Sequence, residues 1–129
     1  MTFETLLVVS LALSLAWVNG ANDISKGVAT LVGSGASRVK TAIWWGTLWT
    51  VLGGIAAVSW GDALLETFSS GYLRPGFAIT SGFVASVLIG AASWVFIATR
   101  RGLPVSTTHA LLGGVAGATL VLAGPGGLR

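Results

Sequence analysis

PGFAITSGFVASVLIGAASWVFIAT, residues 75–99, is a run of 25 residues without one charged side chain. A helix needs about 20 apolar residues to cross the hydrocarbon core of a bilayer. The run is therefore long enough to span a membrane, and Pro75 is placed to open its helix. This stretch predicts an all-α polytopic membrane protein.

Three further stretches without charged side chains lie outward from this one, at residues 5–22, 41–61 and 102–128. The stretch at 41–61 has tryptophans near both ends, which is typical of the aromatic belts at membrane interfaces. The four stretches together predict one membrane domain, residues 1–129. Its expected spans are approximately 5–22, 41–61, 75–99 and 102–123.

The composition supports a membrane protein. Hydrophobic residues make up 53% and charged residues 9% of the chain, whereas soluble domains carry about 25% charged residues. The mean hydropathy is +0.86. The absence of cysteine excludes a disulfide framework, a thiolate metal site and a cysteine nucleophile. Among the 19 glycines, Gly113, Gly114 and Gly117 have the spacing of a close-packing helix face.

The few charges predict an orientation. The first stretch follows Glu4 and no basic region, so it is interpreted as a retained helix and not as a signal peptide. With four crossings, the basic residues divide into Lys26, Arg38, Lys40, Arg100 and Arg101 on one side and Arg74 and Arg129 on the other. The positive-inside rule then places the N-terminus outside the cell (plasma or inner) membrane. No basic cluster is large enough to indicate nucleic-acid binding.

The first motif is GANDISKG, residues 20–27. Its asparagines, glycines and aspartate favour helix interiors poorly, which predicts a helix broken near Gly20–Asp23. A charge at the bilayer centre costs about 2.5–3.5 kcal/mol on insertion scales, so Asp23 and Lys26 should face a cavity or a partner. Asn22 and Asp23 offer oxygen ligands for a cation such as sodium, and Asp23 can carry a proton. The alternative is an interfacial helix cap with Lys26 reaching water.

The second motif is PVSTTH, residues 104–109. It predicts a half-helix, or one arm of a re-entrant hairpin, that starts near Pro104. The first turn of a helix presents unpaired N–H groups and about half a positive charge. A tetrahedral oxyanion can bind there through those groups and the hydroxyls of Ser106, Thr107 and Thr108. The alternatives are an ordinary hydroxyl cap and, for His109, a simple hydrogen-bonding role instead of titration or donation to the anion.

Together the two motifs resemble those of the inorganic phosphate transporter (PiT) family, which includes sodium- and proton-coupled symporters. The resemblance implies two inverted repeats, each with one copy of both motifs. It implies that Asn22 and Asp23 bind the coupling cation and phosphate, and that the hydroxyls at 106–108 face phosphate. This chain departs from the family in having Lys26 where an asparagine is often found, and in holding one copy of each motif.

We therefore expect one half of a symporter for inorganic phosphate, coupled to Na⁺ or H⁺, with no cofactor and no enzymatic activity. The second half could be an antiparallel copy of the chain, a separate partner chain or a missing C-terminal half, because four spans hardly enclose a site with access from both faces. One alternative is transport of sulfate or another tetrahedral oxyanion. Another is a non-transporting accessory subunit in the bilayer. A channel is less favoured because no repeated filter or charged ring is present.

Overall fold

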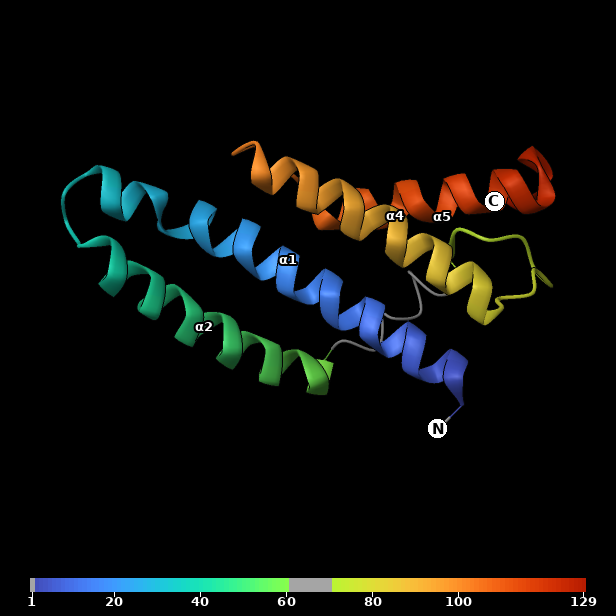
Figure 1. The fold of residues 1–129 in the computed structure, drawn as a ribbon, viewed down its shortest axis with the longest axis horizontal. Helices are drawn as coiled ribbons and strands as arrows, with labels where there is room; N and C mark the ends of the chain where they lie inside the picture. The colour runs from blue at the N-terminus through green and yellow to red at the C-terminus, as the bar shows by residue number, and fades with distance from the viewer. Residues whose placement is uncertain (1, 61–70) are drawn as a thin grey trace.

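The computed structural model describes residues 2–60 and 71–129, and this part of the chain is helical (Figure 1). The prediction of an all-α protein is confirmed. An isolated antiparallel bridge joins Leu73 to Leu128. The elements are α1 (Phe3–Gly33), α2 (Val39–Trp60), α4 (Ser81–Arg100), α5 (Thr107–Ala123) and the short 3₁₀ helix η2 (Pro125–Gly127).

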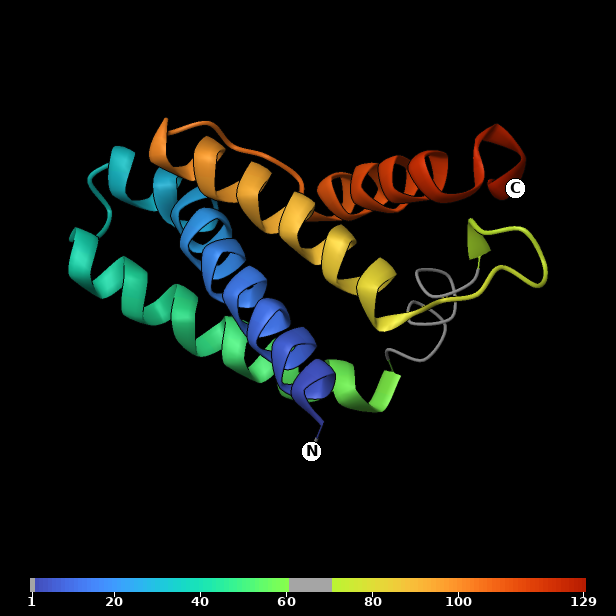
Figure 2. The ribbon, with the colours of Figure 1, turned by 45° about the vertical axis from the view of Figure 1, so that its right-hand side comes forward.

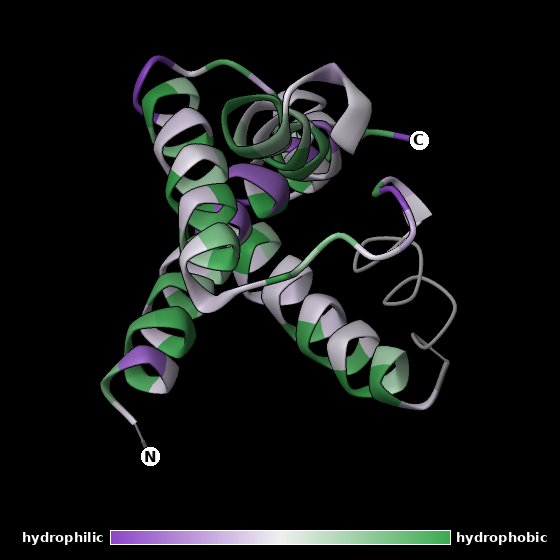
Figure 3. Ribbon diagram, turned by 90° about the vertical axis from the view of Figure 1, so that its right-hand side faces the viewer, coloured by the Kyte–Doolittle hydropathy of each residue, from purple (hydrophilic) through white to green (hydrophobic). Residues whose placement is uncertain are grey.

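Helices α1, α2 and α4 are long and apolar enough to cross a membrane, whereas α5 has 17 residues. At 1.5 Å per residue α5 is about 26 Å long, close to the thickness of a bilayer core of about 30 Å. Large apolar side chains such as Trp17, Trp44 and Val121 are 71%, 77% and 87% exposed. Figure 3 shows hydrophobic residues along most of the length of the helices. Such a surface fits lipid and not water, as expected of a membrane protein.

Neighbouring helices alternate in direction in the way that four crossings require. Helices α1 and α4 lie side by side and run in the same direction, while α2 and α5 run against them (Figures 1 and 2). Ser81 donates to Glu4 over 2.6 Å where both parallel helices begin, and Asn22 donates to Thr99 over 2.9 Å near their other ends. The predicted grouping of basic residues at two ends therefore fits the fold, and the orientation across the membrane stays a prediction.

Two small clusters hold the helices together. Leu15 and Val18 of α1 pack against Ala91 and Val95 of α4, and both α4 residues are fully buried. The second cluster joins α4 to α5 and to the segment before α4, through Leu73, Phe83, Val87 and Val115. Small side chains such as alanine let membrane helices approach closely. The first cluster also contacts Val105 and Ala110, so it supports the start of α5.

The predicted break in the first helix is wrong, because α1 continues through Gly20–Asp23. Helix propensity is a weak preference that tertiary contacts override. The amide side chain of Asn22 bonds to residues of other elements, so it does not compete for the backbone of its own helix. Non-helical backbone instead occupies residues 101–106, between α4 and α5.

One helix start differs from the prediction, and the other lies close to the predicted position. Helix α4 begins six residues after Pro75, where Thr80 caps it by accepting a hydrogen bond from the Phe83 amide at 3.2 Å. Helix α5 begins at Thr107, three residues after Pro104, because Ser106 supplies the capping hydroxyl. In both places a capping threonine or serine, and not the proline, determines where the helix starts.

The predicted glycine face contacts α4 through Gly114. A Cβ at this position would lie 2.9 Å from the carbonyl oxygen of Val87, whereas Gly113 and Gly117 have nothing within 4 Å. Gly114 therefore permits the close approach of α4 and α5, and the other two glycines are exposed on the same helix.

Gly114→Ala should lower the free energy of unfolding by about 1–3 kcal/mol, because the added methyl group meets backbone that cannot move aside. The matched control is Gly113→Ala, which should be neutral or stabilising by up to about 1 kcal/mol since alanine is the better helix former. Thermal unfolding of the detergent-solubilised protein measures both. Equal effects of the two substitutions would contradict the close approach at Gly114.

Candidate functional site

The first motif forms one polar face on α1. Asn19, Asn22, Asp23 and Lys26 are three, four and seven residues apart, a spacing that places side chains on one side of a helix. Asn19 lies near the middle of the 31-residue helix. The face contacts the non-helical segment 101–106 and the first residue of α5.

Asn22 is the buried centre of this contact, with 4% of its surface exposed. Its Nδ2 donates to Thr99 Oγ1 at 2.9 Å and to the Leu103 carbonyl at 3.2 Å, and its Oδ1 accepts from the Val105 amide at 3.4 Å. Non-helical backbone at membrane depth is tolerated only where protein or a cavity satisfies its polar groups. One side chain of α1 thus satisfies the segment that leads into α5.

Asp23 and Lys26 form an ion pair beside it. Lys26 Nζ lies 2.5 Å from Asp23 Oδ1 and donates to the Val105 carbonyl at 2.8 Å. The side chains are 35% exposed for Lys26 and 48% for Asp23, so the pair lies at the edge of the packed helices. The exposed parts of both side chains remain accessible to an ion at this edge of the packed helices.

The second motif forms the start of α5. Ser106 accepts a hydrogen bond from the His109 amide at 3.3 Å, and its hydroxyl lies 2.8 Å from His109 Nδ1. Thr107 donates through Oγ1 to Asn19 Oδ1. Thr108 is exposed, and its hydroxyl makes no hydrogen bond to residues 2–60 or 71–129. Over the same residues the Thr107 and Thr108 amides also have no acceptor, as the first turn of a helix leaves them.

The structure therefore brings the two predicted motifs together. Thr107 bonds to Asn19, one turn of α1 away from Asp23, and Lys26 connects Asp23 to the carbonyl just before the α5 cap. These contacts place the Thr107 hydroxyl, at the start of α5, on the polar face of α1 that carries the acid.

Two residues of the site were not among the predicted site residues. Asn19 could have been found from its spacing of three residues from Asn22 within an apolar run. Thr99 carries no such signal, because a single hydroxyl near the end of an apolar helix is common. Its role is visible only in the structure, where it accepts from Asn22 and donates to the Val95 carbonyl at 2.7 Å.

The oxygen atoms here suit a hard cation. Within residues 2–60 and 71–129 no three His, Cys, Asp or Glu side chains group together as a transition-metal site would require. Carboxylate, amide, hydroxyl and backbone carbonyl oxygens are the ligands that hard cations prefer.

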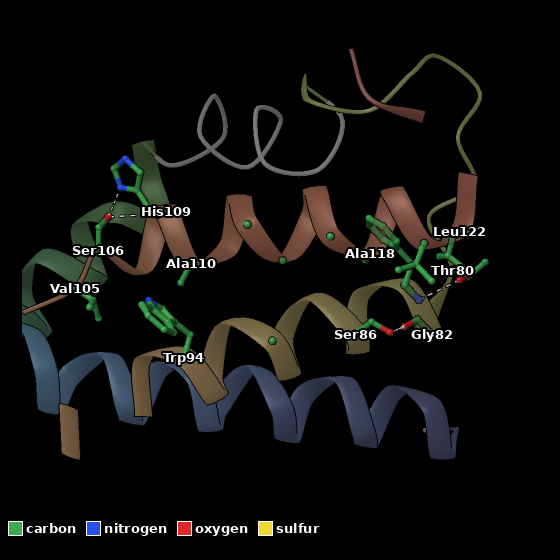
Figure 4. A pocket seen from close by; sticks show the side chains of 16 residues that line it. Thr80, Gly82, Ser86, Trp94, Val105, Ser106, His109, Ala110, Ala118 and Leu122 are labelled. Atoms are coloured by element: carbon green, nitrogen blue, oxygen red, sulfur yellow. Dashed lines mark hydrogen bonds between the residues drawn. The ribbon is translucent and has the colours of Figure 1, made fainter. Parts of the chain in front are cut away.

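A groove of about 1020 Å³ runs between α4 and α5 (Figure 4). Ser106, His109 and Trp94 lie at one end of it, and Thr80 and Ser86 lie toward the other. Glycines and other small residues of both helices line its middle. The groove reaches the start of α5, and its lining does not include the polar face of α1.

Apolar helices of membrane-spanning length define an integral membrane protein. Its polar site lies where the polar face of α1 meets the start of α5. The sequence profile of the phosphate transporter family matches residues 19–129, and the chain belongs to that family. The resemblance drawn from the two motifs is confirmed. Its members are transporters and permeases, so the prediction that the chain is not an enzyme is confirmed as well.

Individual relatives agree with this family. A Pyrococcus abyssi protein named as a phosphate permease is 38% identical over 92% of this chain and 30% of its own length. A Rhizobium meliloti protein named as a low-affinity inorganic phosphate transporter is 31% identical over 91% of this chain and 34% of its own. A solved structure, titled the sodium-dependent phosphate transporter, superposes with a TM-score of 0.83 at 31% identity, covering 98% of this chain and 32% of that one. The chain spans about a third of the length of these relatives.

Proposed function

We propose that this chain forms part of a membrane protein that transports inorganic phosphate together with a cation. The observation that carries the proposal is the contact between the start of α5 and the polar face of α1. Family membership supports phosphate as the substrate, and the sodium-dependent structural relative supports Na⁺ as the coupling ion.

Phosphate would bind at the first turn of α5. The amides of Thr107 and Thr108 point out of the helix start, where the helix dipole favours an anion. The Thr108 hydroxyl adds a donor without adding a full charge, and the hydroxyls of Ser106 and Thr107 would add donors by exchanging their bonds to His109 and Asn19 for bonds to the anion. Binding by partial charges allows an anion to leave again, which transport requires.

The cation would bind beside the anion, near Asp23. A carboxylate oxygen of Asp23 is its first ligand, and Asn22 Oδ1 keeps one lone pair after accepting from Val105. A bound cation would neutralise charge next to phosphate. Binding the two together can then shift the protein between outward- and inward-open states for which they have different affinities.

The rest of the transporter would supply the opposite wall of the site. A second unit of similar size fits within the two thirds of the relatives' length that this chain does not cover. An antiparallel second copy or a separate chain would serve the same purpose. We propose a plasma or inner membrane location with the N-terminus outside, from the charge distribution.

Uptake into proteoliposomes that contain the whole transporter tests the substrate. Labelled phosphate should enter the vesicles when sodium is outside. A tenfold excess of unlabelled phosphate should suppress this uptake, whereas the same excess of sulfate should not. Phosphate retains a proton at neutral pH and can donate a hydrogen bond through it to the Asp23 carboxylate, whereas sulfate carries no such proton. Sulfate uptake without phosphate uptake would assign the site to a different oxyanion, and uptake that needs a proton gradient but no sodium would identify H⁺ as the coupling ion.

Thr107→Val should raise the KM for phosphate about tenfold while lowering the free energy of unfolding by only about 1 kcal/mol, the usual value of one hydrogen bond. The matched control on the same helix is Thr119→Val. Thr119 is fully buried and donates to the Val115 carbonyl at 2.7 Å, far from the first turn, so this change should alter stability without altering KM. The same KM shift in both variants would show that Thr107 has no specific role in binding.

A further inference from the structure

The position of Lys26 distinguishes the site from one that would depend on mobile cations alone. Its Nζ lies 2.5 Å from a carboxylate oxygen of Asp23 and 2.8 Å from the carbonyl oxygen of Val105. Carboxylate and backbone carbonyl oxygens are the ligands that a small hard cation would take. The ammonium group therefore lies between two oxygens that could otherwise hold such a cation.

Contacts on both sides hold Lys26 in this place. Asp23 is three residues earlier on the same helix, and Val105 is 79 residues away, directly before the cap of α5. A lysine that only extended to water would not connect two elements in this way. Two of the three ammonium donors are used by these oxygens, which leaves the third available to a ligand.

The charge balance points the same way. Asp23 alone would leave one negative charge beside the first turn of α5, and like charges at short range repel an arriving oxyanion. The Asp23–Lys26 pair is neutral, so the described part of the site carries no uncompensated charge before any ion binds.

We propose that Lys26 acts as a tethered cation that replaces one mobile coupling cation in each transport cycle. This inference rests on the proposed phosphate transport and adds the stoichiometry to it. The start of α5 would then bind phosphate with one cation fewer than a site with a neutral residue at position 26. The lysine stays attached to α1, so its charge is not released with the substrate.

The test is the charge moved per phosphate by the whole transporter in proteoliposomes, obtained from the reversal potential at fixed pH. This value counts whichever cation is coupled, and the ratio of labelled sodium to labelled phosphate uptake identifies sodium. Lys26→Asn should move one more positive charge per phosphate than the wild type, with a steeper dependence of uptake on cation concentration. Lys26→Arg, which keeps the charge, should retain the wild-type ratio.

The outcomes separate the two proposals. An unchanged ratio in Lys26→Asn, with phosphate transport intact, would overturn the tethered cation and leave the proposed function standing. No phosphate transport by the wild type would overturn both. Lys26→Gln is the second neutral variant if Lys26→Asn fails to fold, and folded neutral variants that stay inactive at every cation concentration would also contradict replacement by a mobile cation.

Discussion

Replacing Asn22 with alanine should lower the free energy of unfolding by about 2–4 kcal/mol and abolish phosphate uptake. The side chain is 4% exposed and satisfies the Leu103 carbonyl and the Val105 amide. Each buried polar group left without a partner costs about 1–3 kcal/mol. The segment before α5 would then lose its attachment to α1, and the first turn of α5 would no longer be held against the polar face.

Thermal unfolding and labelled phosphate uptake on the same preparation measure both effects. The matched control is Thr99→Val, which removes one acceptor of Asn22 and leaves the 101–106 segment bonded to α1. It should cost about 1 kcal/mol and retain most of the uptake. If Asn22→Ala proved no worse than this control, Asn22 would not be the residue that positions α5.

Asp23→Asn should reduce phosphate uptake about 100-fold, because it removes the carboxylate proposed to bind the coupling cation; this factor corresponds to about 2.7 kcal/mol. Stability should change by less than about 1 kcal/mol, because partly exposed ion pairs contribute little to folding. The two readouts therefore separate a binding role from a structural one. Phosphate uptake into proteoliposomes measures the binding role, and thermal unfolding measures the stability.

The control is Glu4→Gln. Glu4 also lies on α1 and accepts a bond from Ser81, but at the far end of the helix from the site. It should leave uptake near the wild-type level. If Asp23→Asn transported phosphate as well as Glu4→Gln, the accessory-subunit alternative would be favoured over a transporting role for this chain.

The apolar runs alone predict the helical fold well. Uncharged stretches of about 20 residues have few alternatives to a membrane helix, so the runs at 41–61 and 75–99 lie largely within α2 and α4. The helix starts were less predictable. Pro75 and Pro104 both precede helices, but the capping side chains of Thr80 and Ser106 decide where each helix begins.

The site was predictable in its residue types and not in its connections. Asn22 and Asp23 were expected to interrupt α1, because local propensity disfavours them in a helix. The structure keeps the helix intact, since the amide of Asn22 bonds to residues 77 to 83 positions away in the chain. Local patterns carry no information about such distant partners, and the same holds for the contact of Lys26 with Val105.

Thiol labelling at the start of α5 tests most directly whether phosphate binds there. Thr108 is exposed, and residues 1–129 contain no cysteine. Thr108→Cys therefore introduces the only thiol within residues 1–129. Phosphate with sodium should slow its reaction with a small thiol reagent about tenfold, corresponding to about 1.4 kcal/mol, while labelling of Ser34→Cys in the α1–α2 loop stays unchanged. Labelling of both positions at rates that phosphate does not alter would contradict a phosphate site at the first turn of α5.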